Sequence, residues 1–416
     1  MNEVSYTVRN MSVAVVQTKV CEDCGGDAIP HRFTYISIAI EEALSSIFPT
    51  KQRKGWVFRT ATKFEDWVAV PFLDIFTAIG LAKKQKRPDD GTLLLARCLW
   101  EEADVRGIEI YEWRLFGLAR NIMVARFPHR NGGKRIAFEG IPAAPYERER
   151  VAWMDDKGRL KEEFRATGLP VARGGSARTS KEALAIYRSL TPPVIVKPQS
   201  GSGSRHTVLH ITEEAELLRA FAVAKQVSPA VVIEEELVGP VYRATVVNGK
   251  FVAALRRDPP HVVGDGTDTL RELVEEANKH PARSGPYFSK IQLNEKAHEE
   301  LKWQGMTLDS VPPAAARVYF HQKVNWALGG TTADVTDDMH PDNRALFETA
   351  AKQLHAPITG IDFIIKDISR SWKDQDRCGI LECNSMPFFD NHHLPFEGQP
   401  RNVAAAIWDM VTPKTT

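Results

Sequence analysis

The side chains best suited to chemistry lie in two segments far apart in the chain. In the first, PPVIVKPQSGSGSRHTVLHI, a β-branched run ends at Lys197 and a stretch of small residues follows. Glycine lets successive backbone N–H groups converge on an anion, and serine hydroxyls add further donors. A phosphate-binding loop is one interpretation, and a flexible surface turn is the other. The small residues are Ser200, Gly201, Ser202, Gly203 and Ser204.

The order of these residues excludes two common nucleotide-binding motifs. A Walker A loop places its lysine after the glycines and directly before Ser or Thr, whereas Lys197 precedes them. The GxGxxG spacing of a Rossmann fingerprint is also missing. A phosphate site here would therefore belong to another fold.

The second segment carries oxygen ligands. Asp362 lies in the apolar run ITGIDFIIKDI, where an unpaired buried carboxylate is costly and needs a cation. In GILECNSMP, Glu382 and Asn384 are two residues apart, so in a strand they share one face. Oxygen ligands of this kind suit Mg²⁺, which is usually held by one or two carboxylates and ligand phosphates. The alternative is a structural pair of carboxylates neutralised by arginines.

Composition indicates an ordinary chain with its own hydrophobic cores. It has 416 residues, of which 43% are hydrophobic and 26% charged, enough for two or three domains. The 54 basic and 53 acidic residues nearly cancel, so no net charge attracts nucleic acid or an anionic membrane. No signal-peptide pattern or apolar window of about 20 residues is present, which predicts a cytoplasmic protein.

The cysteines do not indicate a disulfide framework. There are five, an odd number, which fits a reducing compartment. Cys21 and Cys24 form a CxxC near His31, but nothing completes four zinc ligands. We interpret this spacing as coincidental.

The intervening sequence predicts helices mixed with strands. GTLLLARCLWEEADVRG has helical periodicity and precedes the strand-like IEIYEW, whereas KKQKRPDD, residues 83 to 90, is typical of a solvated turn. TEEAELLRAFAVAK predicts a helix with Thr212 as its N-cap. Asn248-Gly249 lies between two alternating runs, the strongest short signal for a β-hairpin. The expected class is α+β.

Taken in chain order, these pieces resemble the ATP-grasp superfamily. They are Lys157 in DDKGRLK, Lys197 and its small-residue loop, VVIEEELVG, Asp362, and the pair Glu382 and Asn384. The resemblance implies an ATP-grasp fold, in which two α/β subdomains clasp ATP and the loop after Lys197 covers its phosphates. In this superfamily the lysine precedes the phosphate-covering loop, as Lys197 does here, whereas the Walker A lysine follows its glycines.

A closer likeness is to the ATP-grasp module of cyanophycin synthetases, shared in part with bifunctional glutathione synthetases. HVVGDG and GGTTADVTDDMHPDN carry it, and it covers about residues 151 to 412. It implies subdomains at 151–230, with the phosphate flap, and 231–416, with the metal and acyl-phosphate site. Residues 1–150 resemble a pre-ATP-grasp α/β domain only loosely. No Mur-ligase-like module follows, so the chain is not expected to make cyanophycin alone.

The resemblance also implies roles for individual residues. Lys157, Lys197 and the loop from Ser200 to Ser204 would contact phosphates, and Glu234 would accept a hydrogen bond from the adenine amino group. Asp362, Glu382 and Asn384 would hold Mg²⁺ or Mn²⁺. The remaining implied roles are backbone contacts to adenine around Glu235 and Leu237, neutralisation of the transferred phosphoryl group by Arg257, and an acyl-phosphate site lined by Asn325, Gly329 and Gly330.

Three positions depart from the family pattern. Val241 replaces an acidic residue that can bind ribose, so either Glu235, Glu236 or another group substitutes or the ribose contact is weaker. Phe388 replaces a glycine, and Asp390 replaces an arginine two residues before His392. An acid where a base is usual would favour a cationic or amino-bearing substrate. Alternatively, Asp390 merely caps a turn.

The implied activity is an ATP-dependent carboxylate–amine ligase acting through an acyl phosphate on amino acids or a small peptide. The alternatives are a ligase with a non-amine nucleophile and a nucleotide-binding module without catalysis. Small-molecule acids and amines are the expected partners. Nucleic acid and membrane are not expected, and homo-oligomer formation is left open.

Overall fold

The computed structural model describes residues 29–47, 71, 74–117, 122–127, 135–142, 154, 156–200, 205–285, 287–322, 324 and 326–411. The chain forms two compact units. Unit 1 comprises the residues up to Leu44 together with Gly174–Glu234, and unit 2 comprises Ser45–Arg173 and Glu235–Thr416. The three-part division expected from the sequence stays a prediction.

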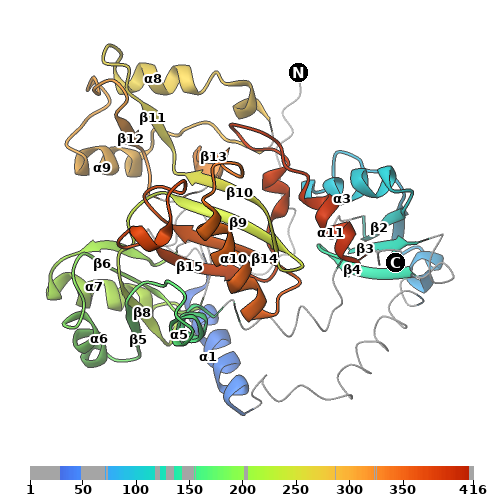
Figure 1. Cartoon of the computed structure of the whole chain (residues 1–416), viewed down its shortest axis with the longest axis horizontal. Coiled ribbons are helices and arrows are strands. Elements are labelled where there is room, and N and C mark those ends of the chain that lie inside the picture. The colour runs from blue at the N-terminus through green and yellow to red at the C-terminus, as the bar shows by residue number, and fades with distance from the viewer. Residues whose placement is uncertain are drawn as a thin grey trace. The chain divides into compact units, whose positions relative to one another are not determined.

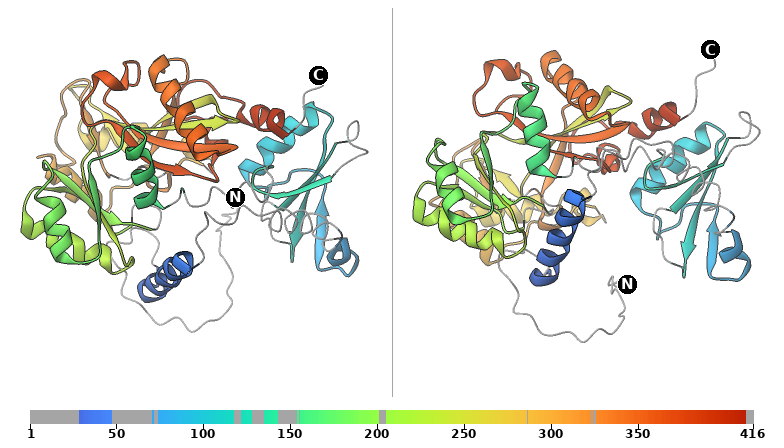
Figure 2. Two further views of the ribbon diagram at one scale, coloured as in Figure 1. Left: turned by 60° about the horizontal axis from the view of Figure 1, so that its bottom comes forward. Right: turned by 90° about the horizontal axis from the view of Figure 1, so that it is seen from below.

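Unit 1 contains a four-stranded sheet in the order β5-β8-β6-β7. Helices α6 and α7 pack on the sheet through a shared apolar core, and Figure 2 shows these green elements from two sides. Helix α1 contributes an edge-to-face contact between His31 and His206, with ring centroids 4.6 Å apart. The elements are α1 (His31–Ile47), β5 (Gly174–Ala177), α6 (Ser180–Tyr187), β6 (Val194–Pro198), β7 (Val208–Ile211), α7 (Glu214–Lys225) and β8 (Val231–Glu235).

The start of α7 differs from the prediction. Glu213, not Thr212, occupies the N-cap position, and no side chain caps the helix. The Glu216 carboxylate instead accepts a hydrogen bond from the backbone N–H of Thr212. Glu214 and Glu216 place anions in the first turn, where the helix dipole favours negative charge, so the helix start is stabilised without a side-chain cap. The predicted Thr212 cap is wrong, although the helix is confirmed.

Unit 2 is built on a five-stranded sheet in the order β13-β10-β9-β14-β15. All its neighbouring strands are antiparallel. Asn248 and Gly249, with φ of 50° and 73°, join β9 to β10 in a two-residue turn, which confirms the predicted hairpin. The strands are β9 (Val241–Val247), β10 (Lys250–Asp258), β13 (Thr331–Asp334), β14 (Ile358–Ile364) and β15 (Gly379–Asn384).

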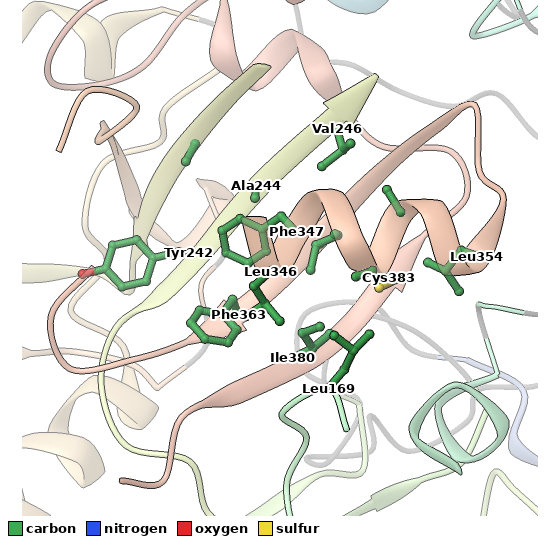
Figure 3. Close-up of a cluster of buried hydrophobic side chains, with 14 of the residues drawn as sticks. Leu169, Tyr242, Ala244, Val246, Leu346, Phe347, Leu354, Phe363, Ile380 and Cys383 are labelled. Atoms are coloured by element: carbon green, nitrogen blue, oxygen red, sulfur yellow. The ribbon is translucent and has the colours of Figure 1, made fainter. Parts of the chain in front are cut away.

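Helix α10 (Pro341–Leu354) covers one face of this sheet, as Figure 1 shows. The side chains on that face are apolar. Alternate residues of each strand reach this face because the side-chain period of a strand is two. Phe347 of α10 lies on Phe363 of β14, with ring centroids 5.4 Å apart. Figure 3 shows the cluster, whose labelled members are Leu169, Tyr242, Ala244, Val246, Leu346, Phe347, Leu354, Phe363, Ile380 and Cys383.

The opposite face changes character along the strands. Its apolar end, with Val247, Ala253 and Ile358, joins a second core. That core also includes the sheet of residues 82–139, called the N-terminal sheet below, and the C-terminal helix α11. Helix α11 lies beside α3 in Figures 1 and 2, and the Trp408 indole donates to the Leu99 carbonyl at 3.0 Å. The elements are β1 (Ala82–Gln85), α3 (Leu94–Val105), β2 (Glu109–Leu115), β3 (Ile122–Arg126), β4 (Arg135–Glu139) and α11 (Val403–Val411).

The N-terminal sheet has the order β1-β2-β3-β4 and corrects one prediction. The first residues of KKQKRPDD are strand, not turn, because Lys83 and Lys84 pair with Arg114 and Trp113. The Lys84 ammonium lies 5.7 Å from the Trp113 ring centroid and 2.5 Å from Asp74 Oδ1. A cation–π contact and an ion pair thus place a charged residue within a sheet.

The chain segment that connects β10 to β13 forms a smaller lobe of unit 2, which has its own apolar cluster. It contains the two-stranded sheet β11-β12. Its elements are β11 (His261–Val263), α8 (Leu270–Ala277), η4 (Pro281–Ser284), α9 (Glu295–Trp303), β12 (Arg317–Tyr319) and the following η5 (Trp326–Leu328). Three further helices of unit 2 are α5 (Lys157–Ala166), η6 (Trp372–Asp374) and η7 (Phe389–His392).

Within the described ranges, no helix combines the length and the apolar composition that crossing a bilayer requires.

We expect Phe347→Ala to destabilise unit 2 by about 3–5 kcal/mol, because Phe347 is fully buried and truncation leaves a cavity. Phe116→Ala is the matched control, since the Phe116 side chain is 75% exposed in the same unit. Denaturant unfolding followed by tryptophan fluorescence measures both. Equal stability of the two variants would contradict the packing described here.

Candidate functional site

Asp362 is the centre of a polar cluster on the second face of the central sheet. It is 3% exposed, and its register partners are Arg243 on β9 and Glu382 on β15. The Arg243 guanidinium donates from Nε to Oδ1 and from Nη2 to Oδ2, the latter at 2.9 Å. Arg257 of β10 donates from Nη1 to the same Oδ2 at 3.2 Å. Both Arg243 and Arg257 therefore supply the positive charge that the sequence required beside Asp362.

These contacts set the charge of Asp362. Burial by itself disfavours the carboxylate, but the positive charges of Arg243 and Arg257 outweigh burial and hold the pKa of Asp362 below its ordinary value. Burial lowers the pKa of Arg257, as does the like charge of Arg243, while Asp362 opposes them. Asp362 is thus a carboxylate between two guanidinium groups.

Glu382 and Asn384 occupy β15 as predicted. Glu382 lies opposite Asp362, and Asn384 lies opposite Gly360, so both face the side that carries Arg243. Cys383 points into the apolar core on the other face. The Lys157 ammonium, on the first residue of α5, lies 3.7 Å from Glu382 Oε2. The buried Asn384 Nδ2 has no hydrogen-bond partner among the described residues.

The donor set fits a hard divalent cation. Glu382 and Asn384 project oxygen-bearing side chains from one strand, and Asp362 adds a carboxylate on the next. The neighbouring cations Lys157, Arg243 and Arg257 leave this cluster without surplus negative charge. Such a site suits a cation that arrives with anionic phosphates better than a free one. Among the described residues no group of three or more His, Cys, Asp or Glu side chains is placed to hold a metal ion, so this donor set depends on the Asn384 amide and on ligand oxygens.

Sequence reasoning missed Arg243. The signal was available, because Arg243 and Thr245 alternate with Tyr242, Ala244 and Val246 in a strand that is buried on both faces. A basic residue at such a position requires a buried carboxylate. Only the sheet order places it beside Asp362, which is 119 residues later in the chain.

Unit 1 carries a second set of predicted residues. Lys197, the next-to-last residue of strand β6, forms an ion pair with Glu234 of β8, with Nζ and Oε2 2.9 Å apart. Both residues are buried. Ser200 lies two residues after the end of β6 and is half-buried, and Gly201, Ser202, Gly203 and Ser204 lie outside the described residues. A buried lysine and glutamate of opposite charge can present both a cation and an acceptor to a ligand.

The segment after β8 is held by its backbone. The Glu235 N–H donates to the Arg173 carbonyl at 2.9 Å, and its side chain pairs with the Arg173 guanidinium at 3.2 Å. Leu237 and Glu236 are half-buried. Gly239 has a φ of 127°, and a Cβ there would meet the Ile365 backbone at 2.4 Å. This segment therefore requires glycine, and the ribose and adenine contacts expected near it stay predictions.

The predicted acyl-phosphate residues are described only in part. Asn325 lies outside the described residues. Gly329 has a φ of 98°, and a Cβ there would meet Ile291 Cα at 2.7 Å, so close packing explains this glycine. The Gly329 carbonyl accepts from Arg283 Nη1 at 2.9 Å, and Gly330 is buried. Their catalytic role stays a prediction.

Asp390 and His392 lie in η7, after β15. His392 is completely buried, and its Nε2 lies 2.7 Å from Thr245 Oγ1 on β9, which ties this segment to the central sheet. Asp390 is half-buried, and its Oδ1 has no hydrogen-bond partner in the described part of the chain. Burial raises the pKa of Asp390 to about 6. Contact of either residue with substrate stays a prediction.

Known proteins show where the likeness lies. The cyanophycin synthetase of Trichormus variabilis is 36% identical over 264 residues, which are 62% of this chain and 29% of that protein. The glutathione biosynthesis bifunctional protein GshAB of Mannheimia succiniciproducens is 31% identical over 269 residues, 63% of this chain and 36% of that protein. The chain therefore spans about a third of the length of these relatives. No family model matches it.

Among solved structures, a bifunctional glutathione synthetase from Pasteurella multocida superposes with a TM-score of 0.58 at 25% identity. The superposition covers 77% of this chain and 44% of that one. The expected fold is therefore confirmed over most of the chain.

His392, the last residue of η7, and His393, which follows it, predict that stability depends on pH. Burial, and next the charge of Arg243, lower the pKa of His392 to about 3, and burial lowers the pKa of His393 to about 4. An unfolded histidine has a pKa of about 6.5, so only the unfolded chain gains these protons as the pH falls below that value. This stabilisation is present above about pH 6.5 and is lost on acidification. Asp390 opposes this effect, because its raised pKa makes the folded chain bind a proton before the unfolded chain does. This is one proton against the two that the unfolded histidines gain.

We expect His392→Gln to reduce the slope of unfolding free energy against pH by about 1.4 kcal/mol per pH unit between roughly pH 5 and 6, the effect of one proton. Urea unfolding at several pH values measures the slope. His298→Gln, at an exposed histidine on α9, is the control and should leave the slope unchanged. An unchanged slope in His392→Gln would show that this histidine is not held neutral.

Proposed function

Because the chain belongs to the ATP-grasp superfamily and resembles the module that cyanophycin synthetases contain, we propose that it is an ATP-dependent ligase. It joins a carboxylate to an amine and forms an amide, with amino acids or small peptides as substrates. One observation supports this most: Asp362, Glu382 and Asn384 share one face of a sheet with Arg257 and Lys157 beside them.

The chemistry follows from the poor leaving group of a carboxylate. Transfer of the γ-phosphoryl group of ATP to the carboxylate oxygen breaks the bond to the β-phosphate oxygen and yields an acyl phosphate and ADP. The amine then attacks the acyl carbon, phosphate leaves, and the ammonium proton passes to solvent or a nearby base. Phosphoryl transfer of this kind depends on positioning and electrostatic stabilisation rather than on covalent catalysis.

The residues divide these tasks by their charge. Lys157, Lys197 and the loop from Ser200 to Ser204 bind the phosphates, and Arg257 offsets charge on the transferring group. Glu234 accepts a hydrogen bond from the adenine amino group while it remains paired with Lys197. Glu382, Asn384 and Asp362 would hold Mg²⁺, which neutralises phosphate oxygens when bound.

The relatives narrow the substrates only by class. One is named a cyanophycin synthetase and the other a glutathione biosynthesis protein. The chain has Asp390 where the family pattern has an arginine, so we propose a substrate that bears an amino or other cationic group at this position. An acid that lacks a cation partner in the described protein can accept one from a ligand.

Turnover tests the proposal directly. Release of ADP and phosphate from MgATP is measured with amino acids and dipeptides, singly and in pairs, and the products are identified by mass spectrometry. The ligase predicts release that needs a particular acid and amine, with a product one water lighter than their sum. Nucleotide binding without stimulation by any pair would favour a binding module instead.

We expect Glu382→Ala to lower turnover by on the order of 10²–10³-fold, because it removes a metal ligand and the partner of Lys157. Glu299→Ala, at an exposed glutamate on α9, is the control and should keep wild-type turnover. Wild-type activity in a folded Glu382→Ala variant would contradict the assignment of the site.

A further inference from the structure

Two guanidinium groups share one carboxylate in the polar cluster of unit 2. We propose that Arg243 is a positioning residue that neutralises Asp362, so that the positive charge of Arg257 remains available to the γ-phosphoryl group of ATP. The inference rests on the proposed function, in which Arg257 faces that group. It assigns to Arg243 a task that neither the sequence motifs nor the family resemblance named.

The geometry separates the two arginines. Arg243 binds Asp362 through both carboxylate oxygens, the strong fork arrangement of an arginine and a carboxylate. Arg257 makes a single longer contact, 3.2 Å to Oδ2, which Arg243 already occupies. Asp362 is therefore satisfied mainly by Arg243, and Arg257 is held at the edge of the pair.

Burial gives the two arginines different access. The Arg243 side chain is 8% exposed and lies beneath the surface of the cluster, whereas that of Arg257 is 22% exposed. The Nε of Arg257 is buried and has no hydrogen-bond partner among the described residues. Arg257 thus keeps donor capacity that Asp362 does not use.

Other nearby charges do not replace Arg243. Glu382 lies beside the Lys157 ammonium, so that carboxylate has its own cation. His392, near Arg243, is neutral because burial first and then Arg243 itself lower its pKa to about 3. Without Arg243, Asp362 would turn to Arg257 and cancel its charge. With Arg243, the three cations Arg243, Arg257 and Lys157 face the two carboxylates of Asp362 and Glu382, so one positive charge stays uncancelled.

The test compares nucleotides that differ only in the γ-phosphoryl group. Isothermal titration calorimetry on the full chain measures the Kd for MgADP and for a non-hydrolysable MgATP analogue, and the ratio of the two reports the contact with that group. We define the ratio as the Kd for MgADP divided by the Kd for the MgATP analogue. In Arg243→Gln we expect this ratio to fall at least fivefold, because binding of the triphosphate weakens, while the Kd for MgADP changes less than twofold. A purely structural loss would weaken both nucleotides alike.

Arg256→Gln is the matched control. Arg256 is also an ion-paired arginine of the central sheet, with Nε 2.8 Å from Asp258 Oδ2, but it is the register partner of Tyr242 and so lies on the other face. Its variant should keep the wild-type ratio. Arg243→Lys keeps a cation beside Asp362, so it should retain a ratio within about twofold of wild type.

The outcomes distinguish this inference from the function on which it rests. A wild-type protein that binds neither nucleotide overturns both. If wild type prefers the triphosphate and folded Arg243→Gln keeps that preference, the inference alone is overturned. Should Arg243→Gln not fold, Arg243→Lys decides, because a more than fivefold loss of the ratio there shows that the charge of residue 243 is not what matters.

Discussion

The buried ion pair between Arg243 and Asp362 is the interaction on which the central sheet of unit 2 and its polar face both depend. The residues lie opposite each other on neighbouring strands, and both are nearly inaccessible. Removal of two charges from water costs several kcal/mol per ion, and only good geometry with complete hydrogen bonding offsets it. The two-point contact supplies that geometry and fixes the register of β9 against β14. The pairing of β14 with β15 then sets Glu382 opposite Asp362.

The sheet separates stability from chemistry by its two faces. Strand periodicity sends Tyr242, Ala244 and Phe363 into the core beneath α10, and sends Arg243 and Asp362 to the other side. A rigid apolar layer behind the polar cluster limits how far its charges can move. Ion pairs arranged on regular strands are held more precisely than the same residues on loops would be.

Residues 94–141 and the C-terminal helix α11 build much of the second core of unit 2. Helix α11 packs on α3, and the indole of Trp408 donates to Leu99, 309 residues away. Phe389, one residue before Asp390, enters the same core. The segment after Asn384 is therefore held by the N-terminal sheet as well as by the bond between His392 and Thr245.

The sequence by itself determined the Asn248-Gly249 hairpin and the alternation of the strands, because both are short-range patterns. It also determined that Glu382 and Asn384 present oxygen ligands on one face of a strand. It also required a cation for Asp362 without identifying it. Only tertiary structure decided that Arg243 fills this place, because sheet order, not chain distance, brings β9 beside β14. The start of α7 and strand β1 were decided likewise, by an anion at a helix terminus and by pairing with β2, contacts that local propensity does not encode.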